Sequence, residues 1–244
     1  VLDLGVPSDA TVTTAKLAND AVTNAKVNDD LISGATALAS EPADTDEFLV
    51  SDAGTLKRID YSLIKASPAI ELLSTVDITS STAQAEFDGL FSSTYKNYKV
   101  IISGLLPVNN SARLQAQMKE GGSYIVSGAY SYLIGADIVY NTTSSSSTNI
   151  EAQANYDRFR LTSEMTNTTS ETNSLEITIY DPLGSHYKAM TWHNSNYGSA
   201  LTNLHRNYVG SGIMRNGTGD ATAIRFYLDS GNIVKGNFKL YGIK

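Results

Sequence analysis

The sequence predicts an all-β protein in which an extended oligomeric shaft precedes a C-terminal antiparallel β-sandwich of jelly-roll-like type. Three observations lead to this prediction. From about residue 70 onward, short apolar runs alternate with clusters of turn-forming residues. Ser, Thr and Asn make up 70 of the 244 residues, and Tyr outnumbers Phe 14 to 6, a usage that favours short strands and loops over helices. A ten-residue repeat lies near the N-terminus, where no aromatic residue occurs before Phe48.

The repeat runs from 12 to 21 as VTTAKLANDA and continues from 22 to 31 as VTNAKVNDDL. Its larger apolar residues recur every five positions, which matches neither the helical nor the strand period. They are Val12, Leu17, Val22, Val27 and Ile32. One chain cannot bury such a row, so the repeat requires copies of itself. We therefore predict a shaft over residues 1–40. The alternative is a disordered linker, which the polar composition also permits.

Residues 41–68 are predicted to form a collar. The runs at 48–50 and 55–59 flank the turn-forming sequence SDAG and indicate a β-hairpin. Residues 60–66 fit one helical turn, which Pro68 would end. Residues 1–66 contain eleven acidic and five basic residues, so most of the net charge of −7 belongs to the shaft and collar.

Residues 69–244 form the predicted sandwich domain. Several runs alternate strictly, such as Ile224, Phe226 and Leu228 against Arg225 and Tyr227, which predicts one buried and one wet face. The candidate strands are 69–76, 98–103, 112–119, 128–132, 157–161, 175–180, 187–193, 224–228 and 236–243.

Four other segments of this domain receive different predictions. The spacing of Phe87, Leu90 and Phe91 predicts a helix over 83–91. Residues 141–148 and 166–173 contain almost only polar residues and are predicted to be exposed loops. The sequence GSG at 210–212 is predicted to be a turn, because it lacks the residues of a phosphate-binding loop.

The chain resembles the tail fibres of tailed bacteriophages. The resemblance rests on the repeat VTTAKLANDAVTNAKV, on the collar sequence DTDEFLVSDAGTLKRIDY at 44–61, and on three stretches of the last domain. These stretches are YKNYKVII at 95–102, GGSYIVSGAY at 121–130 and the ending IRFYLDSGNIVKGNFKLYGIK at 224–244.

The resemblance implies a virion structural protein of the tail appendage, with an extended fibrous trimeric shaft ahead of the β-sandwich. It implies a homotrimer that contacts other virion tail proteins through its N-terminal side. The C-terminal domain would bind a host cell-surface glycan or an outer-membrane protein during adsorption. Because the chain begins at Val1 without an initiator methionine, we expect it to lack its natural start.

A sugar-binding site needs an aromatic ring beside amide, carboxylate or guanidinium groups. The densest such run supplies the candidate ligand-binding residues Trp192, His193, Asn194, Asn196, Tyr197, His205, Arg206 and Tyr208. The alternative places Met190 and Trp192 at alternating core positions, with His193 facing solvent. Tyr130, Tyr132 and Tyr140 form a second candidate with the same two interpretations.

We expect no enzyme, cofactor or metal site. Without cysteine, the chain forms no disulfide, zinc–thiolate site or iron–sulfur cluster, and its three histidines form no metal-binding motif. No Gly-x-Ser-x-Gly motif occurs, and no apolar run is long enough to span a bilayer. The acidic charge argues against a nucleic-acid partner.

Two alternative functions remain at this stage. One is a head or tail connector or decoration fibre that docks another virion protein. The other, less favoured, is a polysaccharide-degrading spike, which would need a pair of carboxylates flanking a glycosidic bond. No short motif in the last domain sets such a pair.

Overall fold

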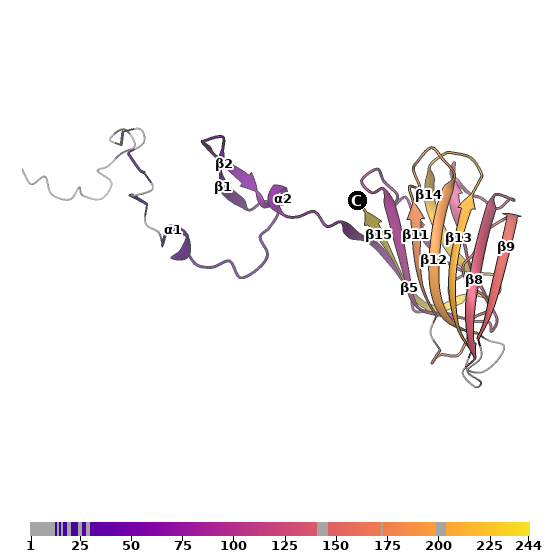
Figure 1. Ribbon diagram of the computed structural model, residues 1–244. Helices are drawn as coiled ribbons and strands as arrows, with labels where there is room; N and C mark the ends of the chain where they lie inside the picture. The colour runs from indigo at the N-terminus through magenta and orange to yellow at the C-terminus, as the bar shows by residue number, and fades with distance from the viewer. Residues whose placement is uncertain are drawn as a thin grey trace, which may run out of the picture. The chain divides into compact units, whose positions relative to one another are not determined.

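The computed structural model describes residues 13, 15, 17–18, 21–23, 26–27, 30–140, 146–171, 173–198 and 204–244, with the side chains of 136–140, 146–149 and 204 left out. The chain divides into two compact units, Val1–Ser67 (unit 1) and Pro68–Lys244 (unit 2). Figure 1 labels the elements of both units. Val12 and the tip of the predicted loop at 141–145 lie outside the described residues.

The described residues of unit 1 contain two short helices and one β-hairpin. After the short helix α1 (Asp30–Ser33), strands β1 (Glu47–Asp52) and β2 (Thr55–Asp60) form an antiparallel hairpin. Its turn uses Ala53 and Gly54, both at positive φ, as a two-residue hairpin loop requires. The helix α2 (Tyr61–Ile64) follows directly. The predicted hairpin and helical turn of the collar are confirmed.

Unit 2 is built from antiparallel strands arranged in two sheets. The five-stranded sheet has the order β10-β6-β14-β4, with β7 paired to β6, and the eight-stranded sheet has the order β3-β15-β5-β11-β12-β13-β8-β9. The strands are β3 (Ile70–Ile78), β4 (Gln84–Asp88), β5 (Asn97–Pro107), β6 (Leu114–Glu120), β7 (Ser123–Tyr124), β8 (Tyr130–Tyr140), β9 (Ser146–Tyr156), β10 (Phe159–Arg160), β11 (Asn173–Tyr180), β12 (Lys188–Gly198), β13 (Leu204–Met214), β14 (Ala221–Leu228) and β15 (Ile233–Ile243).

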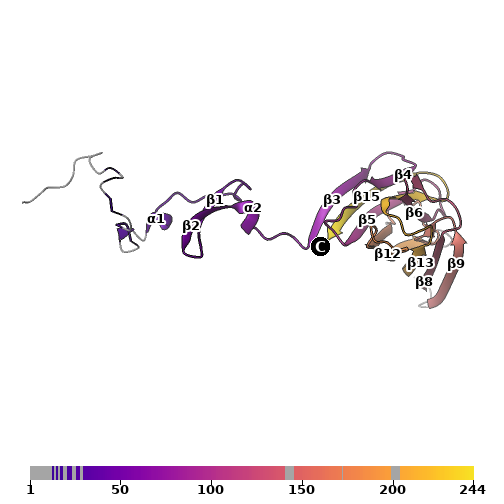
Figure 2. The ribbon, with the colours of Figure 1, turned by 90° about the horizontal axis from the view of Figure 1, so that it is seen from above.

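The two sheets face each other across one hydrophobic core, and Figure 2 shows them as two layers. Ring contacts connect the layers: Phe226 of β14 lies 5.8 Å from Phe238 of β15, and Phe159 of β10 lies 6.2 Å from Trp192 of β12, centroid to centroid. We call the side of the eight-stranded sheet that faces the core its inner face, and the opposite side its outer face. The predicted all-β class and the antiparallel sheets are confirmed.

The helix predicted at 83–91 is wrong, because residues 84–88 form strand β4. Ala85 and Phe87 are buried while Gln84, Glu86 and Asp88 point away from the core, which is the period of a strand. The spacing of the apolar residues misled the prediction, because Phe91 is buried beyond a break in the strand and not on a helix face. Gly89, at a φ of 68°, ends the strand.

Two predictions of non-strand segments are also wrong where the structure describes the residues. Residues 146–148 belong to strand β9, and 210–212 lie inside strand β13. Gly210 and Gly212 are glycines for a packing reason: a Cβ atom at Gly210 would lie 2.2 Å from the Trp192 ring, and one at Gly212 would lie 2.5 Å from the Phe159 ring. Sequence patterns interpret glycine pairs as turns, but here the pair makes room for two aromatic rings of the core.

The predicted exposed loop at 166–173 is partly buried. Thr166 is only 3% exposed and its backbone N–H donates to the carbonyl of Tyr197 (3.1 Å). Asn173 is fully buried at the start of β11, and its Nδ2 donates to the carbonyl of Leu105 (2.9 Å). Hydrogen bonds to the backbone allow these polar side chains to lie inside the protein.

Candidate functional site

The eight candidate residues lie on β12 and β13, two neighbouring antiparallel strands of the eight-stranded sheet. Because side chains alternate along a strand, they divide between the two faces. The inner face receives Trp192, Asn194, Asn196, Arg206 and Tyr208, all of which are buried. The outer face receives His193, Tyr197 and His205. The eight residues therefore do not form one surface.

The inner group packs in the core or near its edge. Trp192 is 2% exposed and its ring contacts that of Phe159, so neither ring face is open to a sugar. Asn194 Nδ2 donates to the carbonyl of Leu161 (2.6 Å). Tyr208, 6% exposed, belongs to the same hydrophobic cluster. Of the two alternatives that the sequence left open for Trp192, the structure shows the core position.

Arg206 and Asn196 are direct cross-strand neighbours on the inner face. The Arg206 guanidinium donates through Nη1 to Ser163 Oγ (2.9 Å) and to the carbonyl of Glu164 (3.3 Å). Asn196 Nδ2 also approaches the Glu164 carbonyl (3.4 Å). Both side chains thus hold the segment after β10 against the sheet, which is a structural role rather than a ligand contact.

The outer group forms a small polar cluster at one end of the sheet. The rings of Tyr197 and His205 are cross-strand neighbours with centroids 5.8 Å apart, close to perpendicular. His205 Nε2 shares a hydrogen bond with Ser195 Oγ (2.7 Å), and His193 Nε2 shares one with Asn207 Oδ1 (2.6 Å). An aromatic edge, two imidazoles, a hydroxyl and an amide on one face are groups that hydrogen-bond and stack on sugars.

The second candidate group does not form a surface either. Tyr130 and Tyr132 are buried on the inner face of β8, and Tyr130 packs against Phe159 with ring centroids 4.7 Å apart. The Tyr130 hydroxyl accepts from the backbone N–H of Met118 (3.0 Å) and donates to the carbonyl of Ile125 (3.2 Å). The side chain of Tyr140 lies outside the described ones.

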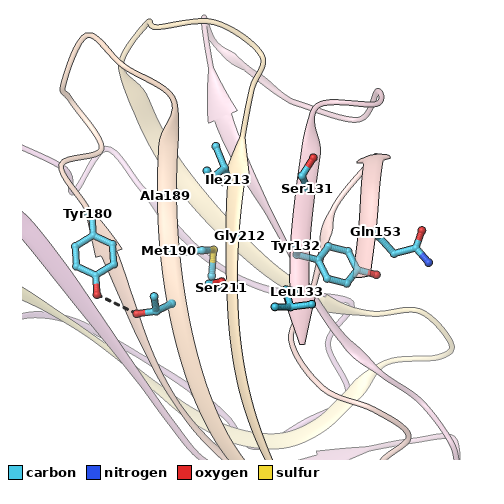
Figure 3. Close-up of a pocket in the computed structure, with 11 residues that line it drawn as sticks. Ser131, Tyr132, Leu133, Gln153, Tyr180, Ala189, Met190, Ser211, Gly212 and Ile213 are labelled. Atoms are coloured by element: carbon cyan, nitrogen blue, oxygen red, sulfur yellow. Dashed lines mark hydrogen bonds between the residues drawn. The ribbon is translucent and has the colours of Figure 1, made fainter. Parts of the chain in front are cut away.

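A shallow groove of about 420 Å³ crosses the outer face at the other end of the sheet (Figure 3). Tyr180 stands at one side with its hydroxyl bonded to Thr191 Oγ1 (3.0 Å), and Leu133 and Ile213 line the middle. Leu133 and Ile213 are 49% and 44% exposed. The groove is mainly apolar, and sequence reasoning missed it because its residues come from five strands that are distant in the chain.

The exposed face of the five-stranded sheet carries a dense polar network that the sequence also did not reveal. Arg225 donates through Nε and Nη2 to Gln117 Oε1 (3.1 and 2.6 Å), and its guanidinium lies 4.1 Å from the ring centroid of Tyr124. The Tyr124 hydroxyl donates to Glu86. Gln117 is only 3% exposed because these neighbours cover it.

The pKa values on this face follow from the same contacts. Burial, and then the hydrogen bond to Glu86, raise the pKa of Tyr124. Burial also raises the pKa of Tyr227. The Arg158 guanidinium hydrogen-bonds to Asp157 and lowers the pKa of that carboxyl. Tyr124 and Tyr227 are therefore protonated and Asp157 is ionised near neutral pH.

Neither a metal centre nor a membrane-spanning helix occurs among the described residues. No group of three or more His, Asp or Glu side chains gathers there in a way that could hold a metal ion. Likewise, none of the described helices is both long and apolar enough to cross a bilayer.

The comparisons with known proteins identify no relative that supports an argument. No family model matches the chain, and no curated protein matches it in sequence. Among solved structures, the crystal structure of the infectious bursal disease virus VP2 subviral particle aligns with 82% of this chain and 47% of that chain. The aligned residues are 10% identical and the TM-score is 0.13, so this similarity carries no conclusion about fold or function.

Proposed function

We propose that this protein is a homotrimeric bacteriophage tail fibre that attaches the virion to its host. In this proposal residues 1–40 form a fibrous trimeric shaft, 41–68 a collar, and 69–244 a jelly-roll-like β-sandwich tip. The N-terminal side contacts other virion tail proteins, and the tip binds a glycan of the host surface. The mechanism is adhesion without catalysis and without a cofactor.

The observation that carries the proposal is the exposure of apolar side chains in unit 1. Leu17, Val22, Val27 and Ile32, four of the five positions of the repeat, are 49%, 63%, 37% and 86% exposed in the single chain. The collar adds Leu49 at 75%, among others. Covering such a row with other chains would remove its apolar surface from water, which is favourable. Winding with copies of the same repeat would cover it along its whole length.

The cluster around Tyr197 and His205 is the favoured sugar-binding surface. Strand β3 begins at Ile70, and the hydrogen-bonded row that starts there reaches β12 at Ala189 through β15, β5 and β11. Tyr197 therefore lies roughly 27 Å further along β12, at 3.4 Å per residue. Within unit 2 the cluster is thus at the end of the sheet opposite to the chain's point of arrival, where a tip would meet its receptor.

Three tips on one fibre would strengthen weak binding. A single shallow, polar contact binds a sugar weakly, but tethered copies raise the effective concentration of the second and third contact. Avidity can exceed the single-site affinity by about 10² to 10⁴ without any new type of contact. A trimeric fibre would therefore allow even this small cluster to hold a virion on its host.

Binding of the purified chain to an array of bacterial lipopolysaccharides and capsular polysaccharides tests the adhesive function. We expect retention of at least one glycan, loss of that retention in Tyr197→Ala and His205→Ala, and no loss in the matched control Tyr187→Ala. Tyr187 is also an exposed tyrosine, 51% accessible, but it lies just before the opposite end of β12. Equal losses in all three variants, or release of reducing sugar from the array, would refute the proposal as stated.

A further inference from the structure

The outer face of the eight-stranded sheet has two chemically different halves. On strands β9, β8, β13 and β12, three neighbouring rows of outward residues contain no Asp, Glu, Lys or Arg. These rows are Ile150, Gly135 and Val209, with His193 at their border; Ala152, Leu133, Ser211 and Thr191; and Ser131, Ile213 and Ala189. We call this surface the uncharged half.

The other half of the same face is charged. Lys99 of β5 and Glu176 of β11 form an ion pair (2.6 Å), and Lys239 of β15 lies in the same outward row as Glu176, with Ile101 of β5 between them. At the border of the uncharged half, Arg215 donates to Ser131 Oγ (3.0 Å) and Glu176 neighbours His193. Depletion of charge in the centre with charge at the rim is the composition of protein interfaces.

Several exposed apolar side chains lie in the uncharged half, whereas those of the other half, such as Ile101, lie beside charged neighbours. Val209 and Ile150 are 63% and 67% exposed, and Leu133 and Ile213 line the groove of about 420 Å³. Four strands at about 4.8 Å and three rows at about 6.8 Å give a patch of roughly 400 Å². This area includes glycine, serine and threonine positions as well as the apolar ones, and an exposed surface with several apolar side chains often marks an interaction site.

Strand β9 forms the edge of the sheet beside the uncharged half. It is the last strand of the order, and within the described residues no strand pairs with its free edge. Its eleven residues include no lysine, arginine or proline. Its one acidic residue, Glu151, forms an ion pair with Arg160 and so leaves the edge without an unpaired charge. Proteins protect a free edge with charges or prolines, or cover it with another element.

We infer that the uncharged half and the free edge of β9 form the surface through which unit 2 contacts a second copy of this chain. A second copy is the occupant because unit 1 exposes apolar side chains that copies of itself would cover, and unit 2 is joined to it covalently. About 400 Å² is half of what a stable interface buries on each partner. The surface therefore suits partners that are already tethered at high effective concentration. This inference rests on the proposed oligomeric fibre.

Single cysteines test it cleanly, since the chain contains none. In the full-length protein, Val209→Cys lies in the uncharged half, and the control Thr75→Cys is an exposed position on β3 at the far side of the same outer face. We expect a maleimide reagent to label the Val209→Cys variant at least about tenfold more slowly than the Thr75→Cys variant, because the interface must open first. A short bismaleimide should join two chains of the Val209→Cys variant and leave the control variant uncrosslinked.

The molar mass of both variants, measured by light scattering, distinguishes failure of this inference from failure of the proposed fibre. An oligomer in which both thiols react at the same rate, and in which the Val209→Cys variant gives no crosslinked dimer, overturns this inference and leaves the proposed fibre intact. A monomer overturns both. Circular dichroism that matches the parent chain shows that neither substitution has unfolded the protein.

Discussion

The indole ring of Trp192 lies directly over Gly210, its cross-strand neighbour on β13. A Cβ atom at Gly210 would lie 2.2 Å from Trp192 Cε2 and 2.4 Å from Nε1. The two residues form a complementary pair in which the absence of one side chain makes room for the other. Trp192, which the sequence offered as an aromatic ring for sugar binding, is thus a core residue that packs over Gly210.

This pair predicts that Gly210→Ala destabilises unit 2. The new methyl group would force the indole ring or the strand to move, which typically costs about 1–3 kcal/mol. The matched control is Gly135→Ala on β8, where the nearest atom to a new Cβ lies 4.0 Å away. Urea unfolding measures both free energies. Adding Trp192→Leu to Gly210→Ala should relieve part of the clash, and additive losses in the double variant would contradict the pairing.

We expect replacement of the buried Lys188 to destabilise unit 2 as well. Its side chain is fully buried and its ammonium donates to the carbonyls of Gly184 and His186. Lys188→Met removes the donor and leaves buried acceptor capacity unused, so we expect a loss of about 1–3 kcal/mol in the free energy of unfolding. Lys96→Met is the control, since Lys96 is an exposed partner of Asp181 and such surface pairs contribute at most about 1 kcal/mol. Equal losses in the two variants would contradict this role.

We expect the buried Tyr130 to make the folded protein less stable at alkaline pH. Burial raises its pKa above the ordinary value of about 10. Between the two pKa values the unfolded chain has released the proton that the folded chain keeps, so stability falls as the pH rises above about 10. The slope from one such tyrosine approaches 1.4 kcal/mol per pH unit at ~25 °C. Unfolding curves at pH 9 and 11 should show a smaller drop for Tyr130→Phe than for the parent, and an unchanged drop for the exposed Tyr187→Phe.

We expect the stability of the polar network on the five-stranded sheet to depend on the guanidinium group of Arg225 and not on its charge alone. Arg225→Lys keeps the charge but loses the double contact with Gln117 and the close approach of the guanidinium to the Tyr124 ring. We expect a loss of about 1–2 kcal/mol in urea unfolding. Arg215→Lys, a change at an exposed arginine, should stay within about 0.5 kcal/mol. The prediction fails when the two variants unfold at the same urea concentration.

Strict alternation made much of the fold predictable. Phe226 and Leu228 are buried while Arg225 and Tyr227 point outward, as their period indicates. The hairpin of the collar was predictable from its turn residues. Strands β4 and β13 were not: the spacing of Phe87, Leu90 and Phe91 imitates a helix face, and the glycines of β13 are explained only by partners elsewhere in the fold. Gly210, for example, makes sense only beside Trp192.

The candidate site was predictable only in part. The run around Trp192 lies on two neighbouring strands, β12 and β13, but the face of each side chain depends on which side of the sheet the core occupies. The groove beside Tyr180 and the network around Arg225 join residues from several strands, so no local pattern contains them. Register across a sheet is a property of the folded chain.

The central claim is that this chain is an oligomeric fibre, and the mass in solution tests it most directly. Sedimentation equilibrium of residues 1–244 should give about three times the chain mass of 26.2 kDa. Residues 68–244, which contain the hydrophobic core by themselves, should associate far more weakly. Replacing Val22 and Val27 by Asn should weaken the full-length trimer. A full-length chain that remains monomeric at ~100 µM would contradict the account.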